Sequence, residues 1–378
     1  MKKIVLLILG IIFFQSVIGQ RAAAVREDGK FGFIKEDGSW LIEPNYEKAG
    51  SFSDGLVAVY NGDQWGFVDS SGNMVIEQKY DKVKKFDSGI ALVAIGKKWF
   101  YINNKGDEVE MPYSEKLYDF DNGLAFIRND GLIGFMNPKG EIVVPPKYTK
   151  VLPFKNGYAK VQLGESWGLV DNSGKEILET VYEEVGYPSE GIMKVKKEGV
   201  YGLLNNGTFT EVKGASKIWG FKDGEALTYA ANKDKLVGFI DRNGQWVIQP
   251  TYKKVKGFAS GLAPVTTNGK QWGFINEKGE ITIKESYKDA EIFSKDGLAP
   301  VKINKYWGFI NKKGDLVIED KYAISAMSFN TLFKSQTKGF IKGLSRVGLK
   351  KKWGYINTKG ELLNNTWYDN AENFVEIN

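Results

Sequence analysis

The side chains that could carry out chemistry in this chain are carboxylates, lysines, hydroxyls and aromatic rings, because its 378 residues include no cysteine and no histidine. The chain therefore cannot form a disulfide, a cysteine-based zinc site, a thiol nucleophile or a serine–histidine relay. Glycoside hydrolysis by a pair of carboxylates remains chemically open. No such pair stands out in the sequence, so we predict no catalytic residue, no metal site and no cofactor, and we expect a protein that is not an enzyme.

The most unusual charged segment runs from 323 to 360 and contains basic residues but no acidic residue. We predict that it contacts an anionic partner, such as a phosphate-bearing polymer of the bacterial envelope. The alternative is a solvated surface or an end cap, which is the more usual role of a run of positive charge. The candidate binding residues are Lys334, Lys338, Lys342, Arg346, Lys350, Lys351 and Lys352.

Tryptophan side chains are further candidates, since their flat rings can serve as stacking platforms for sugars or peptides. Most of them recur at one phase of a repeat, and a fixed phase in every unit predicts burial against neighbouring units. For those outside that phase, a surface position and a core position are equally open. The recurring set is Trp65, Trp99, Trp167, Trp272, Trp307 and Trp353, and the out-of-phase set is Trp40, Trp219, Trp246 and Trp367.

The repeat has a period of about 34 residues and occurs ten times. Each unit is marked by an aromatic or apolar residue followed by glycine, as in Trp65-Gly66. In most units a second glycine follows six positions after the first, a tyrosine fourteen positions after it and a phenylalanine twenty positions after it. Successive pairs are 34 to 36 residues apart except for the last step of 46, which indicates an irregular insertion around 323–350.

The segment from Gly297 to Tyr322 shows the elements expected in one unit. Residues 298–303 and 306–311 have the apolar patterns of two short strands, and the apolar triplet 316–318 predicts a third. Between the second and third strands, Asn311 and Gly314 occupy the ends of a four-residue turn, which favours a type I turn closed by a left-handed glycine. We therefore expect each unit to be a three-stranded meander that folds only when it is stacked against its neighbours.

The glycine after the tryptophan indicates a β-bulge or a close backbone approach, because glycine otherwise weakens a strand. We expect an aromatic ring of an adjoining unit, such as the recurring tyrosine, to lie over this bare backbone. Phe100 replaces the glycine once, and Ser114 replaces the tyrosine of the same unit. A locally altered contact is expected there.

Together, the Trp-Gly pair, the Phe-Ile that follows it, the Asn/Asp-x-x-Gly turn and the downstream tyrosine resemble the WG-repeat (KWG repeat) family of bacterial proteins. The segment QWGFINEKGEITIKESY, from Gln271 to Tyr287, shows the whole pattern. The resemblance extends from about Val25 to Phe374. It implies a β-rich repeat protein without an assigned activity, and it brings no catalytic residue to this chain.

Residues 1–20 have the layout of a secretory signal peptide. Lys2 and Lys3 precede an apolar run from Ile4 to Phe14, which is shorter than the roughly 20 residues of a membrane-spanning helix. We therefore expect an exported protein, periplasmic or extracellular, with no membrane span after signal cleavage. The formal net charge of +6 is mild, so no nucleic-acid partner is expected.

We predict an all-β fold in which residues 21–378 form a tandem array of about ten three-stranded β-meander repeats. An open superhelical solenoid is preferred over a closed propeller-like ring, because 34 residues are few for a four-stranded blade and because the chain begins and ends on nearly whole units. For function we predict a non-catalytic binding or scaffolding protein of the bacterial envelope or secreted space, whose partner is a protein or an envelope polysaccharide. A cell-wall or glycan-binding module is the first alternative, and a carboxylate-based hydrolase is the second.

Overall fold

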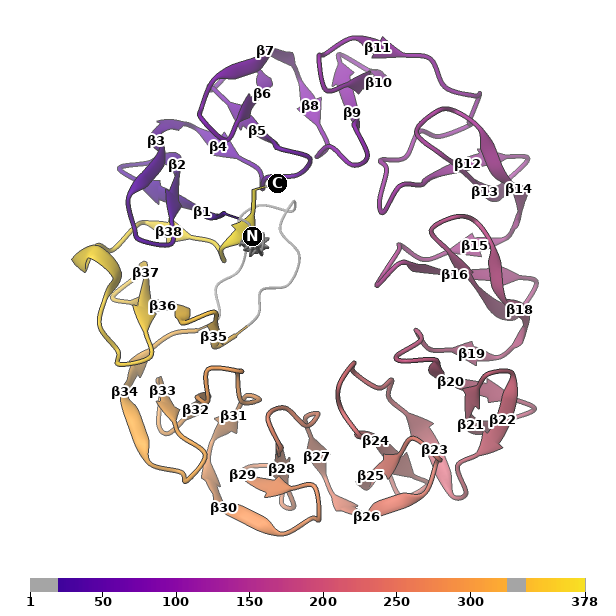
Figure 1. Ribbon diagram of the computed structural model, residues 1–378, viewed down its shortest axis with the longest axis vertical. Helices are drawn as coiled ribbons and strands as arrows, with labels where there is room; N and C mark the ends of the chain where they lie inside the picture. Colours follow the sequence, from indigo (N-terminus) through magenta and orange to yellow (C-terminus); the bar gives the residue numbers. More distant parts are fainter. Residues whose placement is uncertain (1–19, 325–337, 378) are drawn as a thin grey trace, which may run out of the picture.

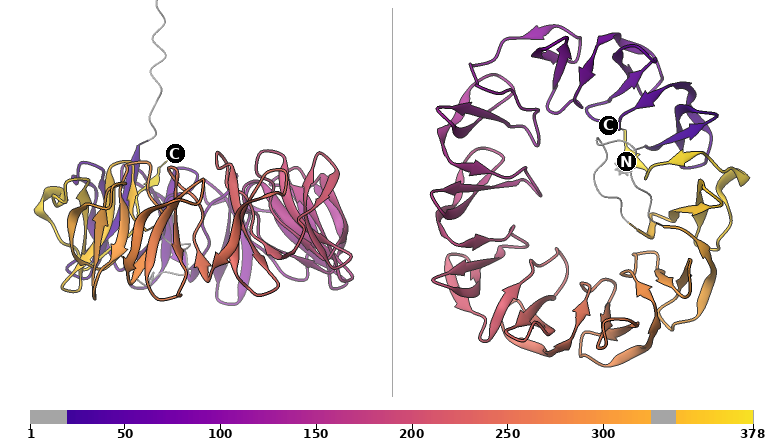
Figure 2. Two further views of the ribbon diagram at one scale, coloured as in Figure 1. Left: turned by 90° about the horizontal axis from the view of Figure 1, so that it is seen from below. Right: turned by 180° about the vertical axis from the view of Figure 1, so that it is seen from behind.

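The computed structural model describes residues 20–324 and 338–377, which form ten small antiparallel sheets arranged in a ring (Figure 1). The strands run between the two flat faces of the ring, where the loops lie (Figure 2). Apart from the short 3₁₀ turn η1 (Leu363–Asn365), the described residues contain strands and no α-helix. Except for Gln20, the predicted signal peptide lies outside the described residues.

We number the sheets 1 to 10 in ring order. Sheet 1 contains β1 (Arg21–Glu27), β2 (Lys30–Lys35), β3 (Trp40–Tyr46), β38 (Asn370–Ala371) and β39 (Val375–Glu376); sheet 2 contains β4 (Lys48–Ala49), β5 (Leu56–Tyr60), β6 (Trp65–Asp69) and β7 (Met74–Tyr80); sheet 3 contains β8 (Lys82–Val83), β9 (Ile90–Ile95), β10 (Lys98–Asn103) and β11 (Glu108–Val109); sheet 4 contains β12 (Ala125–Asn129), β13 (Leu132–Met136) and β14 (Ile142–Tyr148); sheet 5 contains β15 (Lys150–Val151), β16 (Tyr158–Leu163), β17 (Ser166–Asp171) and β18 (Glu176–Tyr182).

The second half of the ring continues in the same way. Sheet 6 contains β19 (Glu184–Val185), β20 (Ile192–Lys197), β21 (Val200–Asn205) and β22 (Thr208–Glu211); sheet 7 contains β23 (Ala215–Ile218), β24 (Leu227–Asn232), β25 (Val237–Asp241) and β26 (Trp246–Tyr252); sheet 8 contains β27 (Lys254–Val255), β28 (Leu262–Thr266), β29 (Trp272–Asn276) and β30 (Ile281–Tyr287); sheet 9 contains β31 (Asp289–Ala290), β32 (Ala299–Lys302), β33 (Trp307–Ile310) and β34 (Leu316–Tyr322); sheet 10 contains β35 (Phe340–Ile341), β36 (Leu344–Leu349) and β37 (Lys352–Asn357).

The predicted turn between the last two strands of a unit is confirmed in sheet 2. Gly72 has a φ of 83°, and its N–H donates to the carbonyl of Asp69 at 3.0 Å. The Asp69 carboxylate accepts hydrogen bonds from the backbone N–H groups of Ser71 and Asn73. A short polar side chain at the first turn position therefore satisfies backbone donors that the turn leaves free.

The glycine after the tryptophan lies where the last two strands of a sheet come closest. In sheet 2 the ladder shifts register between Trp65 and Phe67, so that β7 bulges opposite Gly66. A Cβ on Gly66 would lie only 2.5 Å from the carbonyl oxygen of Ile76. The close backbone approach is confirmed, but the prediction of a covering ring is wrong at this glycine, because the sheet's own backbone fills the space. Phe100 is tolerated in sheet 3 because the outer strand β11 has only two residues.

Phenylalanine pairs cross many of the boundaries between adjacent sheets. Phe67 in β6 packs edge-on against Phe86, which precedes β9 of the next sheet, with ring centroids 4.8 Å apart. Both side chains are only 1% exposed. The equivalent pairs are Phe33 with Phe52, Phe135 with Phe154, Phe239 with Phe258, and Phe274 with Phe293. Where it occurs, the recurring phenylalanine therefore stacks one unit on the next.

The prediction of an open superhelical solenoid is wrong, because the two ends of the described chain share one sheet. β1 pairs with β2 on one edge and with both β38 and β39 on the other. This pairing places Val25 opposite Ala371 and Arg21 opposite Glu376. The ten sheets consequently close into a ten-bladed β-propeller (Figures 1 and 2).

The closed ring, which was only the alternative prediction, is correct, and the open array was preferred because the sheet boundary does not coincide with the repeat boundary. After the tyrosine of most units, a two-residue strand such as β4 crosses to the next sheet and becomes its first strand. β38, which follows Tyr368, does the same for sheet 1 and supplies the shared blade. Most sheets therefore have four strands, not the predicted three. Because the first strand has only two residues in most sheets, a repeat of 34 residues is long enough for a four-stranded blade. Closure also pairs the strand edges that the ends of an open array would expose.

Candidate binding clefts on the inner wall of the ring

A cleft of about 760 Å³ lies between sheets 7 and 8. Its lining comes mainly from the first strands β23 and β27, the second strand β24, and the residues that adjoin them. The fourth strands form the outer rim of the ring, and the first two strands of each sheet lie nearest the central hole (Figure 1). The cleft therefore belongs to the inner wall of the propeller.

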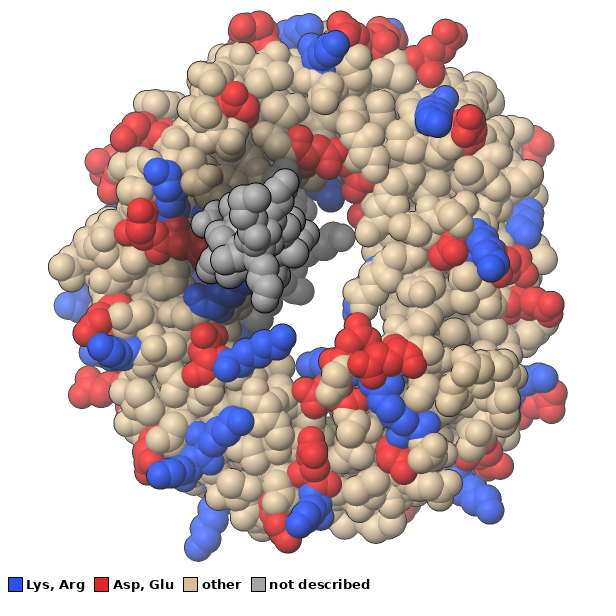
Figure 3. All heavy atoms as spheres, viewed as in Figure 1, with Lys and Arg blue, Asp and Glu red and all other residues tan. Residues whose placement is uncertain are grey.

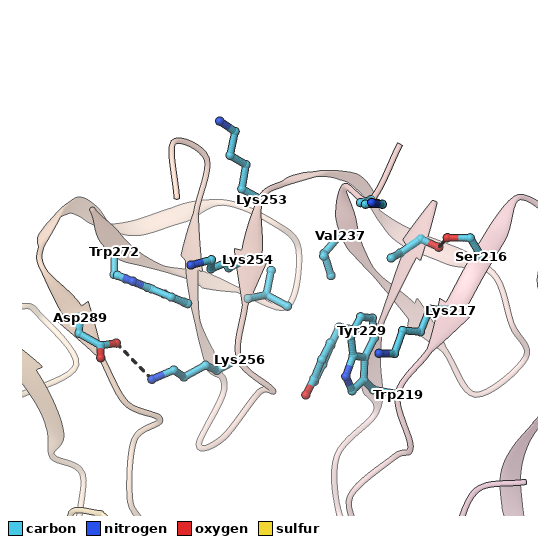
Figure 4. Close-up of a pocket in the computed structure, with 13 residues that line it drawn as sticks. Ser216, Lys217, Trp219, Tyr229, Val237, Lys253, Lys254, Lys256, Trp272 and Asp289 are labelled. Atoms are coloured by element: carbon cyan, nitrogen blue, oxygen red, sulfur yellow. Dashed lines mark hydrogen bonds and ion pairs between the residues drawn. The ribbon is translucent and has the colours of Figure 1, made fainter. Parts of the chain in front are cut away.

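Two stacked aromatic rings form one wall of this cleft (Figure 4). The rings of Trp219 and Tyr229 lie 4.7 Å apart at an interplanar angle of 29°. β23 ends just before Trp219, whose backbone N–H donates to the carbonyl of Tyr229 at 3.0 Å and so keeps the two residues side by side. The corresponding positions of sheet 8 hold Lys256 and Pro264, so the aromatic pair is a departure from the repeat. Burial raises the pKa of Tyr229 above its ordinary value.

Trp272, on β29, also lines the cleft, but it is only 8% exposed and packs in the core with Ala290 and Phe293 of sheet 9. The strand that carries Lys254 lies between Trp272 and the Trp219–Tyr229 pair (Figure 4). Val237 and Val255 add apolar surface to the lining. Lys256 lies over the Trp272 ring, with its Nζ atom 5.3 Å from the centroid. The same ammonium group pairs with Asp289 at 3.3 Å and with Glu291 at 2.9 Å, so both acidic groups partly neutralise its charge.

Four further lysines line the cleft, and all four are exposed: Lys217, Lys235, Lys253 and Lys254. Among the described residues, none of their ammonium groups forms an ion pair with a carboxylate. The Nζ atom of Lys217 lies 4.7 Å from the centroid of Trp219, which is a cation–π distance. Because Asp289 is the one acidic residue of the lining and is already paired, the cleft carries an excess of positive charge.

A second cleft of about 380 Å³ shares Trp219 and Tyr229 with the first and lies on the other side of this ring pair, toward sheets 5 and 6. Its lining again combines an aromatic ring, Tyr187, with the lysines Lys155, Lys160, Lys194 and Lys222. The Nζ atom of Lys160 lies 4.6 Å from the centroid of Tyr187. Burial lowers the pKa of Lys160, and the neighbouring charge of Lys194 adds to this effect.

Three of the seven basic residues predicted to bind an anionic partner are ion-paired with carboxylates. Lys334 lies outside the described residues. Lys338 pairs with Glu291 at 2.7 Å, Lys342 with Glu376 at 3.4 Å, and Lys352 with Asp369. These three lysines therefore connect elements of the ring, and their charge is partly neutralised by acidic residues far away in the sequence.

The other three basic candidates differ in burial. Arg346 is 6% exposed and donates to the carbonyl of Ala371 in β38 at 2.7 Å, so it helps to close the ring. Lys350 and Lys351 form the turn between β36 and β37, with φ values of 49° and 69°. Both are exposed, and neither pairs with a described carboxylate. The predicted anionic contact stays a prediction for these two turn residues.

The tryptophans also separate into two groups. Those in phase with the repeat are buried or half-buried, as predicted. Of the out-of-phase residues, Trp40 packs on Tyr368, Trp246 donates its indole N–H to a backbone carbonyl, and Trp367 joins the core of sheet 10. Trp219 is the one that lines a cleft.

Sequence reasoning missed Tyr229 and the cleft lysines. An aromatic residue at 229 is a signal, because the equivalent positions hold Pro264 and Pro300 in the following sheets. Lys254 carries no such signal, since its equivalent in an earlier unit is Lys82 and repetition makes it look structural.

Other kinds of site were also searched for in the described ranges, 20–324 and 338–377. No group of three or more acidic side chains there is arranged to hold a metal ion. In the same ranges no helix is both long and apolar enough to span a membrane. On the face shown in Figure 3, acidic and basic side chains are interspersed and do not gather into a single basic stripe.

Comparison with known proteins gives a family match and a fold match. The model of the WG containing repeat family matches residues 31–65, 65–99, 99–132, 133–166, 167–201, 238–270, 272–307, 307–322 and 353–376. No curated protein sequence matches the chain.

Solved structures resemble the chain at low sequence identity. A crystal structure of the eukaryotic initiation factor has a TM-score of 0.52 at 11% identity and covers 95% of this chain and 98% of that chain. BamB from Moraxella catarrhalis has a TM-score of 0.30 at 12% identity, covering 78% of this chain and 95% of that one. At such identities the first likeness shows the fold alone.

Proposed function

The chain belongs to the family of WG-containing repeat proteins, and we propose that it is a non-catalytic binding protein that holds its ligand in the cleft between sheets 7 and 8. The observation that carries the proposal is the stacked pair Trp219–Tyr229, which lines the cleft beside Val237 and Val255 and is surrounded by lysines without carboxylate partners. Concave, mostly apolar sites with a few charged groups are typical of ligand-binding sites.

The lining of the two clefts favours binding over hydrolysis. Hydrolysis by carboxylates needs two of them on either side of the scissile bond. The larger cleft is lined by Asp289 alone, which is held by Lys256, and the smaller by Asp223 alone, which accepts a hydrogen bond from the Ser189 hydroxyl at 2.7 Å. Each cleft therefore offers cations and rings to a ligand instead of a pair of acids.

We infer that this binding takes place in the exported space of a bacterium, either the periplasm or the cell exterior. The inference is supported by Lys2 and Lys3 ahead of the apolar run from Ile4 to Phe14. In such a compartment the partner is a protein or a polysaccharide of the envelope. Export is tested by expressing the full-length gene and sequencing the N-terminus of the exported chain, which is expected to begin at residue 20 or 21. An uncleaved chain that stays in the cytoplasm would overturn the inference.

The binding proposal is tested by co-sedimentation of the exported protein with an insoluble bacterial envelope fraction. The double variant Trp219→Ala/Tyr229→Ala removes the aromatic wall and is expected to weaken retention at least about tenfold, since buried aromatic contacts commonly dominate a binding site. The comparison variant Lys350→Glu/Lys351→Glu changes the exposed turn of sheet 10 and should be retained like the wild type. Equal retention of the aromatic variant would refute the cleft as the binding site, and selective loss by the turn variant would favour the basic turn in its place.

A further inference from the structure

Building on this proposed function, we propose that the two clefts bind an acidic oligosaccharide. In this arrangement, sugar rings pack against the Trp219–Tyr229 pair, and the carboxylate or sulfate groups of the sugars pair with the surrounding lysines. The inference depends on three properties, namely the unpaired positive charge of the larger cleft, the Trp219–Tyr229 wall that the two clefts share and the position of the clefts on either side of that wall.

The positive charge of the larger cleft favours an anionic ligand. Lys217, Lys235 and Lys254 line it without any described carboxylate as an ion-pair partner. Exposed ammonium groups lose little hydration when they meet an anion, so each contact contributes modestly and is screened by salt. Several such contacts together select an anionic ligand over a neutral one.

The aromatic and apolar lining of the larger cleft favours a ligand with flat, weakly polar faces. Tyr229 is stacked on Trp219 (Figure 4), and Val237 and Val255 add apolar surface to the same lining. A sugar ring presents C–H groups on its faces and hydroxyls at its edge, so it can cover an aromatic wall while its edge hydrogen-bonds to water or to the Tyr229 hydroxyl. An acidic peptide would satisfy the lysines but would leave this apolar surface in water.

The arrangement of the two clefts favours a ligand that consists of repeated units. The smaller cleft lies on the other side of the Trp219–Tyr229 pair and again combines a ring with lysines, with Lys160 over the Tyr187 ring and Lys155 nearby. Its Lys194 is paired with Glu184. A chain of acidic sugars can place one ring on each side of the shared aromatic pair. Occupying both clefts with one chain raises the affinity above that of a single sugar, because the second contact becomes intramolecular.

The test is isothermal titration calorimetry of the exported protein with defined probes. The acidic probes are an oligogalacturonate and a heparin-derived oligosaccharide, and the matched neutral probe is the methyl ester of the same oligogalacturonate. We expect at least one acidic probe to bind, with an affinity that falls as salt rises, and we expect the ester to bind at least about tenfold more weakly than its parent acid. Two other anionic polymers serve as controls. Oligoglutamate carries carboxylates but has no sugar rings, and oligothymidylate carries phosphates and nucleobases.

Two pairs of variants locate the binding. Lys217→Glu/Lys254→Glu is expected to weaken the acidic probe by more than about tenfold. Lys105→Glu/Lys139→Glu changes the net charge equally at two exposed turns of sheets 3 and 4, which line neither cleft, and should leave the binding unchanged. Tyr229→Ala should weaken binding and Tyr229→Phe should largely preserve it, because the ring face makes the main contact. Thermal melting of each variant confirms that the ring is folded.

The outcomes separate this inference from the proposed function on which it rests. Failure of both acidic oligosaccharides to bind, or tighter binding of oligoglutamate or oligothymidylate, overturns the acidic-sugar inference. In either case the proposed function still stands if the Trp219→Ala/Tyr229→Ala variant loses retention on the envelope fraction. Equal weakening by the two double charge reversals also overturns the inference, since it would show attraction to overall charge alone.

Discussion

A disulfide should form between positions 25 and 371 when Val25→Cys and Ala371→Cys are combined, because ring closure places these residues opposite each other on β1 and β38. Both side chains are fully buried. Opposed residues in an antiparallel ladder have Cα atoms about 4.5–5.5 Å apart, which lies within the range that a disulfide spans. The chain contains no other cysteine, so each molecule has one possible intramolecular bond.

The size of the effect follows from the length of chain that the bond encloses. A loop of about 350 residues corresponds to about 6 kcal/mol of stabilisation in the chain-entropy model, which is an upper limit. Ala371→Cys adds a sulfur to a packed position, and such overpacking costs ~1–3 kcal/mol. We expect a net gain of ~2–4 kcal/mol in the free energy of unfolding, measured by urea denaturation of the oxidised and reduced protein.

The matched control combines Val25→Cys with Ala290→Cys. Ala290 is fully buried in the first strand of sheet 9, at the place in its sheet that Ala371 has in sheet 1, but it does not pair with β1. Crosslinking is quantified by thiol titration and by mobility on a non-reducing gel. If the pair 25/371 stays reduced under oxidising conditions, or if both pairs crosslink equally, the ring is not closed through β38 and the reasoning fails.

Three further predictions concern packing and charge. Gly66→Ala should lower the free energy of unfolding by ~1–3 kcal/mol, since the new Cβ would lie 2.5 Å from the Ile76 carbonyl oxygen; an unchanged value in urea denaturation would show that this space is not needed. Arg346→Met should lower the free energy of unfolding by ~3–5 kcal/mol, because it leaves the buried Glu372 carboxylate without its nearby cation. The exposed control Lys350→Met should change the free energy of unfolding by less than ~0.5 kcal/mol. Similar losses for the two variants would contradict the reasoning. Burial raises the pKa of Glu372 in the folded state, so the contribution of Glu372 to stability is present below the unfolded pKa and is lost as pH rises through the raised pKa. Glu372→Gln should therefore reduce the fall of the urea midpoint with rising pH. An unaltered pH profile of the urea midpoint would contradict this prediction.

Local features of the fold can be predicted from the sequence because they depend on residues close together in the chain. The turn at Asp69 requires only a side-chain acceptor and a left-handed glycine three residues later. The close approach at Gly66 involves two strands joined by that turn. The stacking of units could also be predicted, since one 34-residue unit buries too little apolar surface to offset the entropy of ordering it.

Ring closure depends on contacts between residues that are distant in the chain. The pairing of β38 with β1 joins positions about 350 residues apart, and no local pattern distinguishes Asn370–Ala371 from the equivalent strand of another unit. The accumulated rotation between successive sheets decides whether the two ends meet. That rotation is set by the packing of every sheet on its neighbour, which the period alone does not reveal.

The candidate site shows the same division. Trp219 stood out in the sequence because it departs from the phase of the repeat, and its departure is what places it in a cleft. Its stacking on Tyr229, and the approach of Trp272 and Lys254 from the next sheet, became apparent only when the strands were placed beside one another.

The basic segment near the end of the chain shows why charge counted along a sequence does not predict a charged surface. Sequence alone established that 323–360 lacks acidic residues. The tertiary structure then brought Glu291 to Lys338 and Asp369 to Lys352, and it buried Arg346 behind the closing strand. The sequence thus determined the repeat, its turns and its stacking residues, because these depend on local chemistry. Only the tertiary structure decided closure, the lining of the clefts and which charges remain free, because each depends on which distant side chains become neighbours.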